Sequence, residues 1–529
     1  MLRPSLILFL ALFPFLPQAL AQDPIAALPP ASRWMDHLQN ELLPFWDQPA
    51  ALGSPLGNFP STRCNDGSLV NRANPCPEIG NSSYLMENNQ YLVPLSRQVY
   101  AYCVAFHMTG DTKYLNYARA GIAYLLANAF DPTGGIAEYK DLDANQWLPA
   151  APYRDPQQLA YGLVGMSLYY YLTRDPDILS QIDAVRTYIR DNYWNPDLGA
   201  MQWLLQDYQG TSATSLQLVA TLDQLNTHMA MIGRFVPGRL GLEWRSDACR
   251  YAHSIIDVYY SPPQNLFFLS AGQPSDFDLT QSTTDFGHNS KALWMILNSG
   301  RFCGDSELVN FTWKHAPALL MRAWRDQANT WAGNIGPTGI DPTTDWWMHA
   351  ELDQLSGTLA LHDSSYAARL ASSYTYWFNN WVDHTYAEVW NTVDTTTNLP
   401  TNSNPKQWQW KNGYHSFEHT LVGYITTAAL KDNSVPLYFA FENRPDEAMI
   451  QPYFFNGTVQ SYVEQQSGTE TIQRVTFSDV NVNPLGRSGK RPCLEGQPPR
   501  GECAPLHGRA PSSAASMPAP PRATAVEPQ

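Results

Sequence analysis

Two histidine motifs lie far apart in this sequence, each at the expected start of a helix. The first is Asp285-Phe286-Gly287-His288, the second is Trp410-Lys411-Asn412-Gly413-Tyr414-His415, and Trp346-Trp347-Met348-His349-Ala350-Glu351 stands between them. An imidazole with a near-neutral pKa can remove and return a proton at a carbon next to a carbonyl. An indole face can stack on the C–H face of a pyranose ring. Together these residues predict a site for proton transfer on a sugar.

The overall composition limits the partners of the chain. Its 529 residues are enough for one large core or for two to three domains. The 17 Trp and 28 Tyr are typical of proteins that handle carbohydrate, although large helical cores also use aromatic residues. The net charge of −15 argues against nucleic acid or an anionic membrane as the partner.

The first residues, 1–21, have the pattern of a secretion signal. Arg3 is followed by the apolar stretch Leu6 to Leu16, and Ala19-Leu20-Ala21 matches a small-x-small cleavage site. The apolar stretch is short for a retained membrane anchor, and no later segment is long and apolar enough to span a membrane. We therefore expect a periplasmic or secreted protein, free of the membrane after cleavage.

Export permits disulfide bonds, and the chain has seven cysteines. The expected pairs are Cys64–Cys76, which would close a polar loop, Cys493–Cys503 in the tail, and the long-range pair Cys249–Cys303. Cys103 lies in an apolar helical stretch and is expected to be a buried free thiol. The chain contains no CxxC motif, which argues against a thiolate zinc site.

Helical periodicity dominates the middle of the chain. Apolar residues recur at three- and four-residue spacing in successive segments separated by turn-like breaks such as Thr109-Gly110-Asp111 and Arg174-Asp175-Pro176. The expected helices cover 32–45, 95–107, 112–128, 157–173, 178–193, 214–235, 244–260, 288–299, 306–325, 346–362, 365–383 and 415–430. Loosely repeated helical hairpins of this kind predict an (α/α)6 barrel, with an open solenoid as the alternative.

The residue pattern changes from helical to strand-like near the C-terminus. Short strands are expected at 435–441, 451–455, 458–463 and 472–477, with Asn456-Gly457 as a hairpin turn. The tail is rich in Pro, Gly, Arg and Ala and is expected to be disordered. The predicted organisation is a mainly α chain with a signal peptide (1–21), an (α/α)6-barrel domain (22–432), a small β appendage (433–482) and a disordered tail (483–529).

Several motifs together resemble the N-acylglucosamine 2-epimerase/cellobiose 2-epimerase superfamily over about residues 90–430. The first histidine motif resembles that family's glycine–histidine helix start, and Trp346-Trp347-Met348-His349-Ala350-Glu351 is similar to its Trp-Trp-x-x-Ala-Glu. Trp410-Lys411 with Tyr414-His415 is similar to its late motif, and Arg97-Gln98-Val99-Tyr100 is similar to its first inner helix. Gly134-Gly135-Ile136 falls at its glycine turn. Each motif is short, but their order along the chain is specific.

The resemblance implies a sugar epimerase or aldose–ketose isomerase that needs no cofactor and no metal. His288 and His415 would then act as acid and base: one removes the C2 proton of the ring-opened sugar, and the other delivers a proton to the opposite face or to C1. The implied substrate is a mono- or oligosaccharide. The alternative is a purely structural role, in which each histidine only caps a helix or packs in the core.

The chain departs from the family at two places. Lys291 stands where the family has a glutamate three residues after the first histidine, and its ammonium would lower the pKa of His288. His228 matches a third family histidine, although Ala230 is the alternative occupant of that place in the register.

Further residues are expected to bind the substrate. Arg97 offers a fixed fork of donors for hydroxyls or for the enediolate oxygen, with a structural salt bridge as its alternative role. Trp346, Trp347 and Trp410 are candidates for stacking on the sugar. Glu351 would bind a hydroxyl or hold His349.

Three other functions compete with this prediction. Glycoside or uronide cleavage would need a pair of site carboxylates, for which Glu351 and Asp285 are the candidates. Loss of catalysis would leave a carbohydrate-binding protein. His415-Ser416-Phe417-Glu418-His419 also fits the H-x-x-E-H zinc pattern, but the chain after this helix becomes strand-like, and Glu418 is more simply expected to orient His415.

Overall fold

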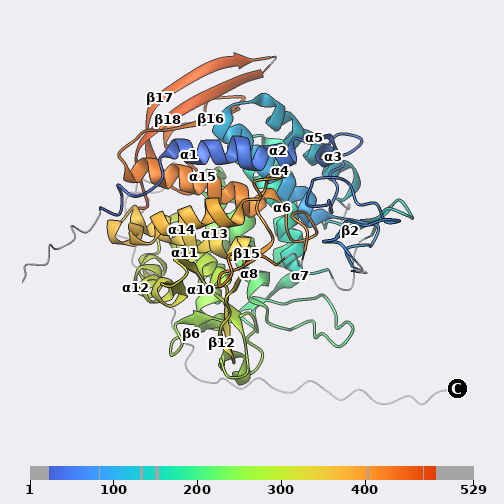
Figure 1. Cartoon of the computed structure of the whole chain (residues 1–529), viewed down its shortest axis with the longest axis vertical. Coiled ribbons are helices and arrows are strands. Elements are labelled where there is room, and N and C mark those ends of the chain that lie inside the picture. Colours follow the sequence, from blue (N-terminus) through green and yellow to red (C-terminus); the bar gives the residue numbers. More distant parts are fainter. Residues whose placement is uncertain are drawn as a thin grey trace, which may run out of the picture. The chain divides into compact units, whose positions relative to one another are not determined.

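The computed structural model describes residues 23–483, except 81, 83, 131–134, 149–153, 402–403 and 469. The expected signal peptide, Gly134 of the expected glycine turn, the pair Cys493–Cys503 and the tail beyond Asn483 therefore lie outside the described residues. Within these limits the chain is mainly helical, with several small sheets (Figure 1).

One set of helices is almost completely buried. In α4 every residue from Leu92 to Met108 is buried, including polar side chains. The members of this inner set are α4 (Leu92–Thr109), α6 (Pro156–Thr173), α8 (Leu218–Gln224) with η2 (Leu225–Met229), α9 (Ala230–Ile232) and η3 (Gly233–Phe235), α11 (Phe286–Cys303), α13 (Trp346–Ala360) and α15 (Gly413–Leu430). Because these helices are buried all round, their apolar residues occur on every side and not on one face alone.

The inner helices contact one another in a closed order. α4 packs on α6, α6 on α8 and η2, η2 and α9 on α11, α11 on α13, α13 on α15, and α15 returns to α4. A second set packs around them: α1 (Ala31–Asp36) with η1 (His37–Leu42) and α2 (Leu43–Trp46), α5 (Thr112–Asn128), α7 (Pro176–Tyr193), α10 (Gly238–Tyr259), α12 (Ser306–Ala323), and α14 (Leu370–Tyr376) with η5 (Ser364–Ala368) and η6 (Trp377–Trp381). The helical segments expected from the sequence all fall on these helices.

The turns between paired helices follow from their capping residues. Asp111 caps α5, and its side chain accepts a hydrogen bond from the backbone N–H of Lys113. Asp175 caps α7 in the same way. Gly110 ends α4 in the left-handed conformation with φ 72°, where glycine carries no steric penalty. The breaks recognised in the sequence are therefore a C-cap followed at once by an N-cap.

Short strands that the sequence analysis did not recognise lie in the connections between helices. Examples are the two-stranded pairs β4 (Trp194–Asn195) with β5 (Ala200–Met201), β6 (Tyr260–Ser261) with β7 (Leu266–Phe267), and β9 (Trp324–Arg325) with β10 (Thr330–Trp331). Three-stranded sheets join β1 (Asn89–Tyr91), β2 (Tyr139–Asp141) and β3 (Gln146–Leu148); β8 (Thr284–Asp285), β11 (Asn334–Gly336) and β12 (Gly339–Ile340); and β13 (Thr343–Asp345), β14 (Thr392–Asp394) and β15 (Leu399–Pro400). Strands of two or three residues are too short to show an alternating pattern.

The C-terminal strands form one antiparallel sheet in the order β16–β18–β17, with β16 at Val435–Phe439, β17 at Asn456–Ser467 and β18 at Glu470–Asn481. Two expectations are wrong here. Residues 451–455 form no strand, and Asn456-Gly457 begins β17 instead of making the hairpin turn, which lies after Ser467 where Gly468 has φ 65°. The side chains of Tyr453, Phe454 and Phe455 are buried, so this apolar run fills space instead of pairing.

The cysteine predictions that fall on described residues are confirmed. Cys64 is bonded to Cys76 and Cys249 to Cys303, while Cys103 is a buried free thiol. Both disulfides are consistent with an oxidising compartment. In the part of the chain that the structure describes, no helix combines the length and apolar character needed to cross a membrane.

Candidate active site

A cavity of about 170 Å³ lies where several inner helices begin. His288 is the third residue of α11, Trp346 and Trp347 open α13, and His415 is the third residue of α15. The complete lining is Arg97, Gln157, Tyr161, His288, Lys291, Trp346, Trp347, Trp410 and His415. Helix N-termini carry partial positive charge, so this end of the helices favours a substrate oxygen that becomes negative.

His288 is held by Asp285, the N-cap of α11. One carboxylate oxygen of Asp285 accepts from the backbone N–H of His288 at 2.6 Å, and the other lies 2.7 Å from the ring Nδ1. A carboxylate at this distance keeps the proton on Nδ1 and leaves Nε2 for chemistry. Asp285 therefore supplies an orienting carboxylate to His288, although Lys291 replaces the glutamate of the family pattern.

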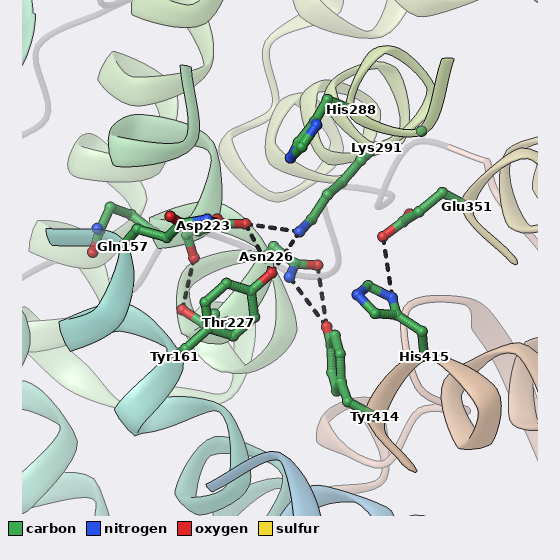
Figure 2. A network of polar contacts seen from close by, with 12 residues as sticks. Gln157, Tyr161, Asp223, Asn226, Thr227, His288, Lys291, Glu351, Tyr414 and His415 are labelled. Atoms are coloured by element: carbon green, nitrogen blue, oxygen red, sulfur yellow. Dashed lines mark hydrogen bonds and ion pairs between the residues drawn. The ribbon is translucent and has the colours of Figure 1, made fainter. Parts of the chain in front are cut away.

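His415 lies deeper, with its side chain only 4% exposed. Burial and the positive charges of Arg97, Lys291, His288 and Lys411 hold its pKa well below the usual range. Its Nδ1 lies 3.6 Å from Oε1 of Glu351, and Figure 2 shows the second ring nitrogen on the other side of the ring. The rings of His288 and His415 both approach Trp347, with centroid distances of 4.6 and 6.1 Å.

Lys291 lines the cavity beside His288, but its ammonium is used elsewhere. It donates to the carboxylate of Asp223 at 2.7 Å and to the hydroxyl of Tyr161 at 2.9 Å (Figure 2). Burial alone would lower the pKa of Lys291, but the charge of Asp223 and the neighbouring Tyr161 and Glu351 raise it above the ordinary lysine value. The ammonium is therefore a fixed positive charge in the cavity wall.

The expected substrate-binding residues gather at the cavity, with one exception. Arg97 donates from Nη1 to the backbone oxygen of Trp410 at 2.7 Å, stacks over Tyr161 at 3.9 Å, and forms no ion pair among the described residues, so the salt-bridge alternative does not apply. Trp346, Trp347 and Trp410 all line the cavity. Glu351 does not line it but lies directly behind His415.

The expectation that Glu351 holds His349 is wrong. Glu351 accepts from the indole N–H of Trp294 at 2.7 Å, and its other oxygen faces His415. His349 is buried away from the cavity and contacts Asp353 at 3.3 Å. Positions 349 and 351 are two positions apart, which places their side chains on different sides of a helix.

His228 is not brought to the cavity. It is fully buried on η2, its Nδ1 lies 2.9 Å from the hydroxyl of Thr227, and its ring packs against Trp244 of α10. Burial lowers its pKa to about 3. Asn226, two positions earlier, faces inward instead and bonds to the hydroxyl of Tyr414 at 3.1 Å. The third-histidine expectation therefore fails because the register places the ring between the inner and outer helices.

Sequence reasoning missed a polar network beside the cavity. Asp223 accepts from Lys291, from Tyr161 at 3.2 Å and from the side-chain amide of Gln157 at 2.9 Å (Figure 2). The signal that could have revealed it is the i, i+3 spacing of Asp223 and Asn226 in a helical stretch with many apolar residues, since two polar residues on one face of a buried helix must find partners.

Three residues at and behind His415 lie close together. Glu351, His415 and Glu418 bring one side-chain atom each to within 4.8 Å of one another. The positive charges of Arg97, Lys291 and Lys411 act against a cation there, but Lys291 is paired with Asp223 and Lys411 with Glu388. The H-x-x-E-H pattern does not bring its two histidines to one point, because His419 turns to Asp353 at 3.0 Å. Among the described residues, Cys64 and Cys76 lie near Glu78, but they are bonded to each other.

Solved structures with the same fold are known. Cellobiose 2-epimerase from Bacillus thermoamylovorans B4167 matches with a TM-score of 0.63 and 15% identity, over 75% of this chain and 98% of that chain. Cellobiose 2-epimerase from Spirochaeta thermophila DSM 6192 gives 0.63 and 17%, over 76% and 97%. A D-mannose isomerase gives 0.60 and 15%, over 75% and 98%. No family model and no curated protein matches the sequence. The resemblance to the N-acylglucosamine 2-epimerase/cellobiose 2-epimerase superfamily is thus confirmed in the fold.

Proposed function

We propose that the chain is an exported sugar 2-epimerase or aldose–ketose isomerase that works by proton transfer between histidines. The observation that carries this proposal is that His288 and His415, 127 positions apart, line one cavity with Trp347 against both rings. The substrate class is a mono- or oligosaccharide, as the names of the structural neighbours suggest.

The proposed architecture is an (α/α)6 barrel followed by a small β appendage. The closed order of contacts among the inner helices supports the barrel over an open solenoid, in which the first and last helices would not meet. The domain limits remain those expected from the sequence: a signal peptide at 1–21, the barrel at 22–432, the appendage at 433–482 and a tail at 483–529. The two disulfides support export to a periplasm or beyond.

The proposed reaction begins on a ring-opened sugar. One histidine takes the proton from C2, and the electron pair of the broken C–H bond forms a C1=C2 double bond while O1 becomes negative. Return of a proton to the opposite face of C2 re-forms the C1 carbonyl and gives the epimer. Transfer of the O2 proton to O1, followed by delivery of a proton to C1, forms the C2 carbonyl and gives the ketose. Arg97 and the helix N-termini stabilise the negative enediolate, and the tryptophans hold the sugar. The chemistry proposed here needs no cofactor.

The alternatives receive less support from the site. Glycoside or uronide cleavage needs two carboxyls at the substrate, but neither Asp285 nor Glu351 lines the cavity, and each is engaged with a histidine. A carbohydrate-binding protein without catalysis would keep the cavity but would not need oriented histidines.

The test is incubation of the mature protein with a panel of aldoses in D2O. Deuterium at C2 is expected, and its appearance should fall by about 10²–10⁴-fold when His288 or His415 is replaced by Ala. His384→Ala serves as the control, because this side chain is 58% exposed and does not line the cavity. New reducing ends without C2 exchange would establish cleavage instead, and sugar binding without either reaction would establish a binding protein.

A further inference from the structure

Three polar atoms meet behind His415. They are Nδ1 of His415, Oε1 of Glu351 and Oε2 of Glu418, and all three atoms are buried. Nδ1 lies 3.6 Å from the first oxygen and 3.9 Å from the second. Two carboxylates buried close together repel each other, so an arrangement with both ionised is costly.

The second carboxyl is held from outside the inner helices. Oε1 of Glu418 accepts a hydrogen bond from the hydroxyl of Tyr453 at 2.5 Å, and that hydroxyl lies 2.7 Å from the hydroxyl of Tyr100. Tyr453 belongs to residues 449–455, which we call the C-terminal plug. It precedes β17 and is therefore part of the C-terminal segment rather than of the helical ring.

Three arginines near the C-terminal ends of inner helices fix the C-terminal plug. Arg174 donates to the backbone oxygen of Met449 at 2.9 Å, Arg234 to that of Phe455 at 3.1 Å, and Arg301 to that of Phe454 at 2.9 Å. Tyr453 itself has φ 56°, a left-handed conformation that costs on the order of 1–3 kcal/mol for a residue with a side chain. Such a conformation persists only where surrounding contacts impose it. Here the contacts with the three arginines impose it, and the side chain is thereby placed so that its hydroxyl reaches Glu418.

The charged groups around the three atoms come from every neighbouring inner helix. Those that act on His415 are Arg97, His288, Lys291 and Lys411. Those that act on Glu351 are Lys291, Asp223 and Glu418, and the charge that acts on Glu418 is that of Lys291. Hydrogen bonds from Tyr453, Gln354 and Tyr100 also lower the pKa of Glu418. Burial is the largest cause of a raised pKa for both carboxyls, and Lys291 opposes it in both.

We propose that Glu351 and Glu418 share a single proton behind His415, and that Tyr453 of the C-terminal plug is a positioning residue that holds Glu418 in this pair. The pair then carries one negative charge. This role deepens the proposed function and rests on it, but the existence of the shared proton can be measured without any sugar.

One negative charge is the value that proton transfer at His415 needs. With no negative charge on the pair, the imidazolium of His415 would have to form beside Arg97, Lys291 and Lys411 with no carboxylate next to it. With two negative charges on the pair, His415 would already carry its extra proton and could not act as a base. With one, Nδ1–H of His415 can donate to Glu351 while the other ring nitrogen accepts the substrate proton, and the imidazolium that forms is balanced.

The first experiment is an infrared difference spectrum in D2O between the wild type and the double variant E351Q/E418Q at neutral pH. We expect the difference to contain both a C=O stretch of a protonated carboxylic acid and the bands of an ionised carboxylate. Only one of the two kinds of band would overturn the shared proton, and so would a stoichiometric metal in the purified wild type that is absent from the double variant. This readout stands even if no sugar is turned over.

The second experiment is the pH dependence of turnover. A raised carboxyl pKa means that the pair loses its proton as the pH rises through it, so wild-type kcat is expected to fall on the alkaline side. In E418Q the remaining carboxyl of Glu351 loses the repulsion of Glu418 and is ionised at neutral pH, so no second ionisation is left. The alkaline fall should therefore disappear, while kcat near neutral pH stays within about 10-fold. An alkaline limb that is identical in E418Q would overturn the proposal.

The role of the plug is tested by Tyr453→Phe against Tyr171→Phe. Because the hydrogen bond from Tyr453 lowers the pKa of Glu418, its loss should shift the alkaline limb upward. The hydroxyl of Tyr171 contacts the same plug, through the backbone of Gln451 and Tyr453, but does not touch Glu418. Tyr171→Phe should therefore lower the Tm without moving the pH profile. Equal pH profiles in both variants would remove Tyr453 from the mechanism.

Discussion

His288 and His415 line the same cavity but are held in contrasting ways. The side chain of His288 is 18% exposed, and one nearby carboxylate, Asp285, fixes its ring through a short contact. His415 is almost fully buried, is surrounded by positive charges, and faces two carboxyls that stand farther off. The first histidine is oriented by a direct hydrogen bond, whereas the second is governed by the balance of charge around it.

This difference would allow two chemically identical side chains to serve the opposite roles that we propose for them. A hydrogen bond to a carboxylate fixes the tautomer of an imidazole, while the surrounding charge sets its pKa. Lys291 links the two environments, since it lies one turn after His288 on α11 yet acts electrostatically on His415. Its departure from the family pattern therefore concerns the second histidine more than the first.

The largest effect is expected from Asp223→Asn, which leaves the buried ammonium of Lys291 without its carboxylate. Removing one partner of a buried ion pair typically costs about 3–5 kcal/mol, so the free energy of unfolding should fall by this amount in urea titrations. The double variant D223N/K291M removes both charges and should recover much of the loss. An equal loss in the single and the double variant would show that shape, and not charge, dominates this part of the wall.

A smaller effect is expected from Asp285→Asn, which breaks the His288 side of the comparison. Asn still caps α11, so stability should change little, but the fixed tautomer is lost and kcat should fall by at least about 10²-fold. Asp305→Asn, at the N-cap of the outer helix α12, is the matched control and should leave kcat unchanged. An unaltered kcat in D285N would mean that the orientation of His288 does not depend on this carboxylate.

Arg97→Met tests whether surrounding positive charge sets the pKa of His415. The charge of Arg97 is one cause of the depressed pKa of His415, second only to burial. Its removal should raise that pKa, so that the ring gains its proton at a higher pH than in the wild type. Titration followed by NMR of ¹⁵N-labelled histidine measures this shift, with Lys113→Met on the outer helix α5 as a control. A pKa that stays fixed would show that burial alone sets it.

The smallest effect is expected from Trp347→Phe, because a smaller ring still contacts both histidines. Aromatic contacts of this kind contribute about 0.5–1.5 kcal/mol, which corresponds to a rise in KM of about 2- to 13-fold with little change in kcat. A fall in kcat with an unchanged KM would instead place Trp347 in the transition state.

The helices and the histidine pair were predictable because their signals are local. Apolar periodicity located the helices, and aspartates after left-handed turn residues located the breaks. The motifs around His288 and His415 lie at helix starts, where three neighbouring residues fix the direction of a side chain. The features that the sequence hid depend on register and on distant partners.

His228 and Asn226 are two residues apart, and only the packed structure shows which one turns inward. The partnership of Glu351 with His415 joins residues 64 positions apart, and no local pattern separates it from the expected contact with His349. The misread strand at 451–455 has the same cause: its aromatic residues look like a strand, but they fill the end of a helical ring.

The closed ring of inner helices also bears on how the protein is made. Arg97 of α4 bonds to Trp410 across 313 positions, and Trp34 of α1 to Thr427 of α15 across 393. A nascent chain emerging from the ribosome cannot form these contacts until almost all of it has been synthesised. The apolar faces of its first helices therefore remain exposed during synthesis. Because the closing contacts join residues so distant in sequence, the packing of the first helices against the last ones is expected to be slow. Ring closure is thus expected to be the step at which chaperones matter most for this protein.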